Sequence, residues 1–187
     1  MAVTTLDPNT ALIVIDLQNG ILALPTAHPT GEVVKNSRVL LDAFRKHQLP
    51  VVLVNVAGGA PGRTEQARHS GAFPAGWSDL VPELNQQPQD HLVTKRTWGA
   101  FTGTDLEQYL RGRGVTQVVI VGVATAIGVE STARQAYELG FNVTLAVDAM
   151  TDLNPDTHHN TITRIFPRLG ESGTTAEVVA LLEQTRA

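Results

Sequence analysis

Residues 118–128 read VVIVGVATAIG, a run that passes from an apolar segment into a glycine-containing turn. Its first part, Val118–Val121, is short, β-branched and apolar at every position, which is typical of a parallel strand covered by helices on both faces. Ala11–Ile15 (ALIVI), which ends at Asp16, and Val51–Val54 (VVLV) share this character. Two weaker strand candidates are His91–Thr94 and Asn142–Val147.

Segments with helical periodicity separate these runs. They are Glu32–Gln48, Thr104–Arg111, Ile127–Leu139, Pro155–Phe166 and Thr175–Thr185. Thr104 and Glu107 form a predicted capping box, and Gly140 is a predicted helix stop. The alternation predicts an α/β fold, a three-layer sandwich whose mainly parallel, Rossmann-like sheet of about six strands is flanked by helices.

The chain has 187 residues, which favours a single domain over residues 1–187. Its net charge of −4 argues against nucleic-acid binding through a basic face. No apolar run reaches the roughly 18 residues that span a bilayer, and the N-terminal segment lacks the basic start of a signal peptide. We therefore expect a cytoplasmic protein with no membrane partner.

Cysteine is absent from the chain. This composition excludes disulfides, thiolate-bound zinc, iron–sulfur clusters and a cysteine nucleophile.

Residues 57–88 are rich in glycine, proline and polar side chains. We expect a long excursion over the edge of the sheet. Long loops in compact domains are usually lids or binding loops, and the alternative is a passive irregular loop.

Three segments directly follow candidate strands and should share one edge of the sheet, where open parallel sheets bind ligands. They are Asp16–Asn19, Lys95–Trp98 and Gly122–Gly128. Each alone is a weak signal, because a strand-end aspartate is often a helix cap, a lysine is often solvated, and a glycine turn is often architectural. The spacing of Gly122 and Gly128 does not match the dinucleotide-binding pattern.

These segments together resemble the isochorismatase-like hydrolases of the cysteine hydrolase superfamily. The resemblance rests on Asp16, on KRTWGAF at residues 95–101 and on GVATAIGVESTAR at residues 122–134, and it extends from about Ala11 to Leu182. It implies a catalytic aspartate and lysine at Asp16 and Lys95. Most members have a cysteine nucleophile for amide cleavage at the position of Gly128. Isochorismatases proper, like this chain, lack that cysteine, and they hydrolyse an enol ether without a covalent intermediate.

Enol-ether hydrolysis needs a proton donor for the vinylic carbon. Asp16 could serve if its pKa is raised; burial would raise it and a charged Lys95 would lower it, and the sequence leaves that balance open. Lys95 could equally hold a substrate carboxylate. Thr125 and Ser131 are the hydroxyls nearest Gly128, but neither has a histidine partner in the sequence, so we do not favour a hydroxyl nucleophile.

Further residues are predicted to bind a small, anionic substrate. They are Gln18, Arg63, Trp98, Phe101, Ala124 and Thr125. Arg63 offers a planar guanidinium for a carboxylate, although a surface role is equally plausible. Trp77, Trp98 and Phe101 could wall an apolar pocket. The resemblance also implies a cis bond between Val123 and Ala124.

We expect neither a metal nor another cofactor. Metal-dependent relatives have Asp-x-His where this chain has Asn55-Val56-Ala57, and His158 and His159 are interpreted as surface or packing residues. The resemblance implies a homo-oligomer, a dimer or tetramer. The alternative to an enzyme is a cysteine-type amidohydrolase relative that has lost its nucleophile and only binds a small molecule.

Overall fold

A computed structural model describes residues 3–66 and 71–185. Its centre is a six-stranded sheet in the order β3-β2-β1-β4-β5-β6, and every neighbouring pair is parallel. The strands are β1 (Thr10–Ile15), β2 (Val51–Val56), β3 (His91–Lys95), β4 (Gln117–Val123), β5 (Asn142–Thr151) and β6 (Glu171–Gly173). The predicted α/β sandwich with a parallel sheet is confirmed.

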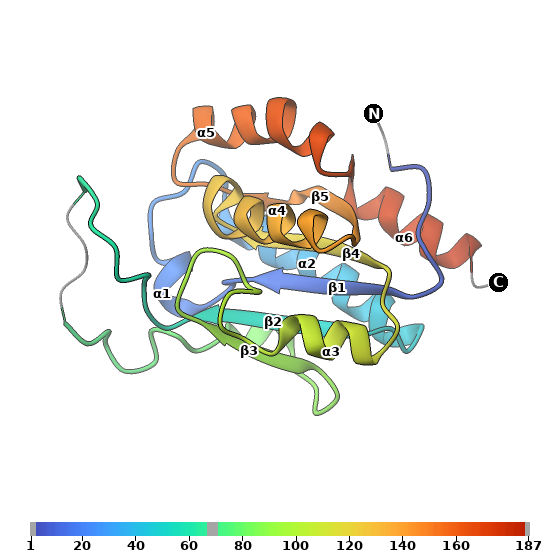
Figure 1. Ribbon diagram of the computed structural model, residues 1–187, viewed down its shortest axis with the longest axis horizontal. Helices are drawn as coiled ribbons and strands as arrows, with labels where there is room; N and C mark the ends of the chain where they lie inside the picture. The colour runs from blue at the N-terminus through green and yellow to red at the C-terminus, as the bar shows by residue number, and fades with distance from the viewer. Residues whose placement is uncertain (1–2, 67–70, 186–187) are drawn as a thin grey trace.

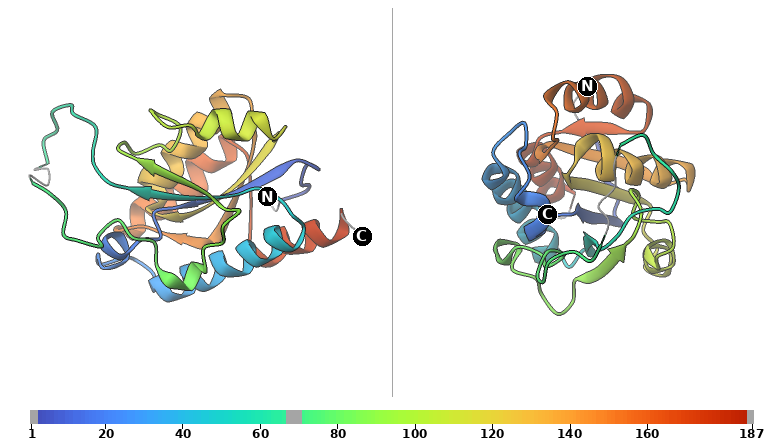
Figure 2. Two further views of the ribbon diagram at one scale, coloured as in Figure 1. Left: turned by 90° about the horizontal axis from the view of Figure 1, so that it is seen from below. Right: turned by 90° about the vertical axis from the view of Figure 1, so that its left-hand side faces the viewer.

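Helices cover both faces of this sheet (Figures 1 and 2). One face is covered by α2 (Thr30–Lys46) and α6 (Thr175–Gln184), and the other by α3 (Leu106–Gly112) and α4 (Glu130–Glu138). The shorter helices are α1 (Asn19–Leu22) and α5 (Pro155–Asn160). Within the described part of the chain, no helix is long and apolar enough to cross a membrane.

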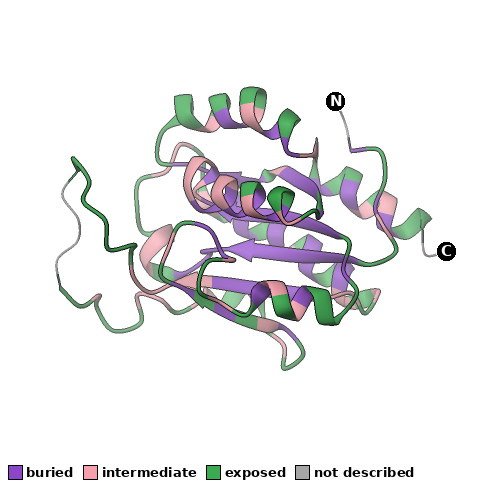
Figure 3. Cartoon of the chain, in the orientation of Figure 1, coloured by how far each residue is buried: buried purple, intermediate pink, exposed green. Residues whose placement is uncertain are grey.

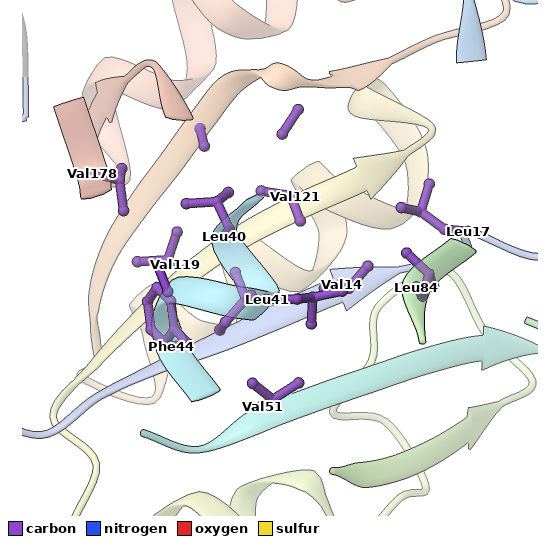
Figure 4. Close-up of a cluster of buried hydrophobic side chains, with 14 of the residues drawn as sticks. Val14, Leu17, Leu40, Leu41, Phe44, Val51, Leu84, Val119, Val121 and Val178 are labelled. Atoms are coloured by element: carbon purple, nitrogen blue, oxygen red, sulfur yellow. The ribbon is translucent and has the colours of Figure 1, made fainter. Parts of the chain in front are cut away.

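Strand β1 supplies both hydrophobic cores, because neighbouring side chains of a strand point to opposite faces. Leu12 and Val14 pack in the core beneath α2 and α6, whereas Ile13 and Ile15 pack in the core beneath α3 and α4. Figure 4 shows Val14 in the first core near Leu41 of α2. All of β1 is buried, as the purple central strand in Figure 3 shows. This two-sided burial explains the continuous apolar run in the sequence.

Several helices differ from their predicted bounds. No capping box forms at α3, because the helix begins at Leu106 with Asp105 at the N-cap; the Thr104 hydroxyl accepts from Leu106 N at 3.3 Å and donates to the Ala100 carbonyl at 2.6 Å. The predicted helix 127–139 is divided into a wide π-type turn, Thr125–Val129, and α4.

The segment after α5 also departs from a regular helix. It continues as a π-type turn, Thr161–Ile165, and a 3₁₀ turn, Phe166–Arg168, where Pro167 has no N–H to donate. A capping box not foreseen from the sequence joins Thr174 and Glu177 at the start of α6.

The described parts of the 57–88 loop extend away from the body at the end of the sheet where the strands terminate (Figure 1). Its only helical element among described residues is the 3₁₀ turn Pro82–Leu84. The end of the loop is attached to the chain that follows β1, through a bridge between Gln18 and Leu80 and a hydrogen bond from Val81 N to Leu17 O. The loop therefore borders the same edge as Asp16.

Candidate active site

Asp16 lies where β1 ends, in the left-handed backbone region with φ 53°. Its backbone N–H donates to Val54 O at 2.9 Å, and its carbonyl accepts from Gln18 N at 2.9 Å. The side chain is turned inward, and only 4% of the residue is exposed. The sharp turn thus places a buried carboxyl group at the edge of the sheet.

Lys95 reaches this carboxyl group from the end of β3, two strands away. Its Nζ donates to Asp16 Oδ2 at 2.7 Å and to Thr97 O at 3.2 Å, and the residue is 2% exposed. The structure therefore brings the two predicted catalytic side chains into direct contact.

Burial raises the pKa of Asp16 to about 6, because a carboxylate loses its hydration there. The charge of Lys95 and its hydrogen bond act in the opposite direction and only partly offset the effect of burial. The second oxygen, Oδ1, is buried and has no hydrogen-bond partner among the described residues. The group can therefore hold a proton near neutral pH and has one oxygen free to transfer it.

The turn after β4 forms the opposite wall. Gly122 has φ 120°, and the peptide bond between Val123 and Ala124 is cis. Gly128 faces the carboxyl group, since a Cβ atom built there would lie 3.2 Å from Asp16 Oδ2 and 2.9 Å from Ile15 Cγ2. Any side chain at position 128 would therefore start beside the carboxyl group.

These groups line a pocket of about 220 Å³. The lining residues are Asp16, Ile21, Leu24, Val56, Gly58, Gly59, Trp77, Lys95, Thr97, Trp98, Val123, Ala124, Ile127, Gly128 and Leu153. A larger hollow of about 430 Å³ lies at the other end of the sheet. Its carboxylates bind neighbouring side chains, Asp7 with Thr116 and Asn142, and Glu171 with Thr4, so the smaller pocket is the better candidate for chemistry.

Residues 10–177 match the Isochorismatase domain. The uncharacterized isochorismatase family protein YwoC of Bacillus subtilis is 47% identical over 184 residues, 95% of this chain and 94% of YwoC. The chain belongs to the isochorismatase family. An isochorismatase family protein of Burkholderia thailandensis has a solved structure with a TM-score of 0.92 and 45% identity, covering 96% of this chain and 98% of that one. Nicotinamidase 3 of Arabidopsis thaliana is 31% identical over 166 residues, 83% of this chain and 81% of that protein.

Of the predicted substrate-binding residues of this isochorismatase family member, two line the pocket. Ala124 lies in the wall, and Trp98, 63% exposed, stands at the mouth. Gln18 is fully buried, and its amide is engaged with the backbone: Nε2 donates to Val56 O and Trp77 O, and Oε1 accepts from Val56 N at 2.7 Å. Gln18 therefore holds the loop in place instead of lining the pocket.

Arg63 and Phe101 lie outside the pocket lining as well. Arg63 is exposed on the 57–88 loop. Phe101 packs against the core beneath α3 and α4, with its ring centroid 6.0 Å from that of Phe141. Phe101 does not line the pocket because its side chain packs against the hydrophobic core. Arg63 does not line it because the loop that carries this residue extends away from the body.

The Thr125 hydroxyl has a histidine partner that the sequence did not reveal. Its Oγ1 lies 2.8 Å from Nδ1 of His158, which corrects the expectation that Thr125 has no histidine partner and gives His158 a packing role beside the turn. Burial, followed by the charge of His28, lowers the pKa of His158. Thr125 is fully buried and does not line the pocket, so this pair fixes the turn from outside.

Several lining residues were not foreseen from the sequence. Ile21 lies in the short helix α1, and Leu24 and Leu153 lie in loops; all three are ordinary apolar residues with no pattern that distinguishes them. Trp77, predicted as a possible wall, does line the pocket; its ring lies against Gly20, where an added Cβ would meet the indole, and it is stacked with Phe73 at 3.9 Å between ring centroids.

The side chain of Asn55 makes a structural contact. Asn55 Nδ2 donates to Ser78 O at 2.8 Å and helps attach the loop to β2. Among residues 3–66 and 71–185, no group of three or more His, Asp or Glu side chains could hold a metal ion.

Proposed function

We propose that this protein is an isochorismatase-type hydrolase that cleaves the enol-ether bond of a small anionic molecule, without a covalent intermediate and without a cofactor. The observation that carries this proposal is the pairing of Asp16, a buried carboxyl with its pKa raised to about 6, with Gly128, which has no nucleophile to offer. An acid without a nucleophile suits protonation of a vinylic carbon better than acyl transfer.

The reaction starts with transfer of the Asp16 proton from Oδ1 to the terminal vinylic carbon, which becomes a methyl group. The resulting oxocarbenium ion accepts water, and the water gives a proton back to the Asp16 carboxylate. The hemiketal then collapses to a ketone and the free alcohol. Lys95, 2.7 Å from Oδ2, stabilises the carboxylate that exists between the two proton transfers.

Pyruvate release tests this function. The purified protein is incubated with isochorismate and with simpler 1-carboxyvinyl ethers, and pyruvate is followed with lactate dehydrogenase and NADH. We expect release of pyruvate from at least one enol ether. We expect no release of ammonia from nicotinamide or ureido substrates. Release of ammonia from an amide, with no pyruvate from any enol ether, would contradict the proposal.

The pH dependence of turnover tests the acid. Because protonated Asp16 is the active form, turnover should be highest below pH 6 and should fall about tenfold per pH unit well above it. Lys95→Met removes the charge and hydrogen bond that lower this pKa, so its alkaline limb should move to higher pH. Lys46→Met, which removes an exposed lysine paired with Glu183, is the control and should not shift the limb. A limb that stays in place in Lys95→Met would show that another group controls turnover.

The alternative function is that of an amidohydrolase relative without its nucleophile. One observation favours this alternative: a Cβ atom at position 128 would lie 3.2 Å from Asp16 Oδ2, so a cysteine there would start beside the carboxyl group. Gly128→Cys tests it: amide hydrolysis gained by this variant, together with no enol-ether hydrolysis in the wild type, would support the alternative.

A further inference from the structure

The described lining of the pocket contains two charged side chains, Asp16 and Lys95, and they are paired with each other. An ammonium group has three N–H donors. Lys95 uses one on Asp16 and one on Thr97 O, which leaves a single donor for a ligand. The hydroxyl of Thr97 already donates to Gly99 O at 2.9 Å. The base of the pocket can therefore receive one carboxylate.

The mouth of the pocket is apolar. Six large hydrophobic side chains are exposed in the described part of the chain, and three of them line this pocket: Leu24 (41% exposed), Trp98 (63%) and Leu153 (45%). They come from three separate segments, after α1, after β3 and after β5. Ile21 and Trp77 continue the same surface inward. Exposed apolar groups that gather around a concave site mark where an apolar part of a ligand is bound.

Two arginines lie on segments that contribute lining residues, Arg96 after β3 and Arg63 in the 57–88 loop. Arg96 Nη1 donates to Ala57 O at 3.0 Å, and Arg63 is exposed on the extended loop. Neither is among the residues that line the pocket. A second carboxylate on a ligand would therefore lie against the apolar mouth, where no described lining residue supplies a cation, and it would lose part of its hydration without an ion pair in return.

We propose that the substrate is a monocarboxylate enol ether, with its one carboxylate on the vinylic side near Lys95 and an uncharged, apolar alcohol portion between Trp77, Trp98 and Leu153. This inference rests on the proposed function and narrows it, because it excludes enol ethers with a second carboxylate on the alcohol portion.

A matched pair of substrates tests the inference. One is the 1-carboxyvinyl ether of cyclohexanol, and the other is the same ether with a carboxylate at ring carbon 3. We expect kcat/KM for pyruvate release to be at least about tenfold higher for the first compound. Equal or faster turnover of the dicarboxylate would overturn the inference and leave the proposed function standing.

Binding provides a readout that does not depend on turnover. The chain has two tryptophans, Trp77 and Trp98, and both line the pocket, so their fluorescence reports ligand binding there. The saturated, unreactive counterparts of the two ethers are titrated, and the monocarboxylate should bind at least about tenfold more tightly. If that preference is found but no enol ether releases pyruvate, the proposed reaction is wrong while the ligand class is supported. Tighter binding of the dicarboxylate would overturn the ligand class whatever the reaction.

A variant pair completes the test. Leu153→Arg places a cation at the mouth and should reduce the preference for the monocarboxylate at least about tenfold. Leu92→Arg is the matched control, because Leu92 is 46% exposed on β3 and does not line the pocket. The control should leave the preference unchanged. An unchanged preference in Leu153→Arg, or an equal change in both variants, would contradict the proposed place of the alcohol portion.

Discussion

Asp16→Asn is expected to reduce turnover of a confirmed substrate by about 10²–10⁴-fold, the usual contribution of a general acid or base. Asparagine has nearly the same shape but cannot deliver a proton from its side-chain oxygen. Lys95 can still donate to that oxygen, so the pocket keeps its outline. Turnover is measured by pyruvate release and binding by tryptophan fluorescence, and binding should change far less than turnover.

Asp90→Asn is the matched control for this substitution. Asp90 is also a buried carboxylate paired with a cation, since it lies 2.5 Å from Arg45 Nη2, but it is outside the pocket lining. This variant should lose stability and keep turnover per folded molecule. Near-normal turnover in Asp16→Asn would show that Asp16 is not the proton donor and has only a structural role at the end of a strand.

Asp16→Asn should also change how the free energy of unfolding depends on pH. The folded chain holds the Asp16 proton up to about pH 6, whereas the unfolded chain releases it near the ordinary value of 3.8. The folded state therefore binds more protons between these values, and this group makes the free energy of unfolding fall as pH rises from 3.8 to 6. Asp16→Asn should remove that part of the pH dependence, which urea titrations at several pH values can measure.

The fold and the pair at its centre were predictable because both depend on local pattern. β1 is apolar over residues 11–15 and β4 over residues 118–121, Asp16 directly follows β1, and Lys95 is the last residue of β3. In a parallel sheet all such positions lie at one edge, so the contact between the two side chains follows from topology. β6 has three residues and no such pattern, so it could not be assigned.

The rest of the site depends on distances that the sequence does not contain. His158 meets Thr125 only because α5 packs beside the turn, 33 residues further along the chain. Gln18 was expected to bind substrate because it follows β1, but its amide is taken up by the backbone of a loop whose path was unknown. The pKa of Asp16 required the balance between burial and Lys95, and only the structure gives the extent of burial.

Gly122→Ala is expected to be the most destabilising single change near the site, with a loss of about 3 kcal/mol or more in the free energy of unfolding. Gly122 has φ 120°, a conformation that residues with a side chain rarely adopt. A Cβ atom there would lie 2.0 Å from the Ile15 carbonyl oxygen. That oxygen belongs to the backbone of the central strand, so it cannot move aside as a flexible side chain could.

Gly31→Ala is the control for this prediction, because Gly31 lies in α2 and a Cβ atom there would meet nothing within 4 Å. Alanine should leave stability unchanged or raise it by up to about 1 kcal/mol, as expected for glycine replaced in a helix. Urea unfolding midpoints compare the two variants, and an unchanged midpoint for Gly122→Ala would contradict the prediction.

Gly122 pairs in register with Ile15, the residue before Asp16, so close approach of the two backbones also sets where the carboxyl group lies relative to the turn. Any Gly122→Ala protein that does fold should therefore lose turnover as well as stability, whereas Gly31→Ala should keep both.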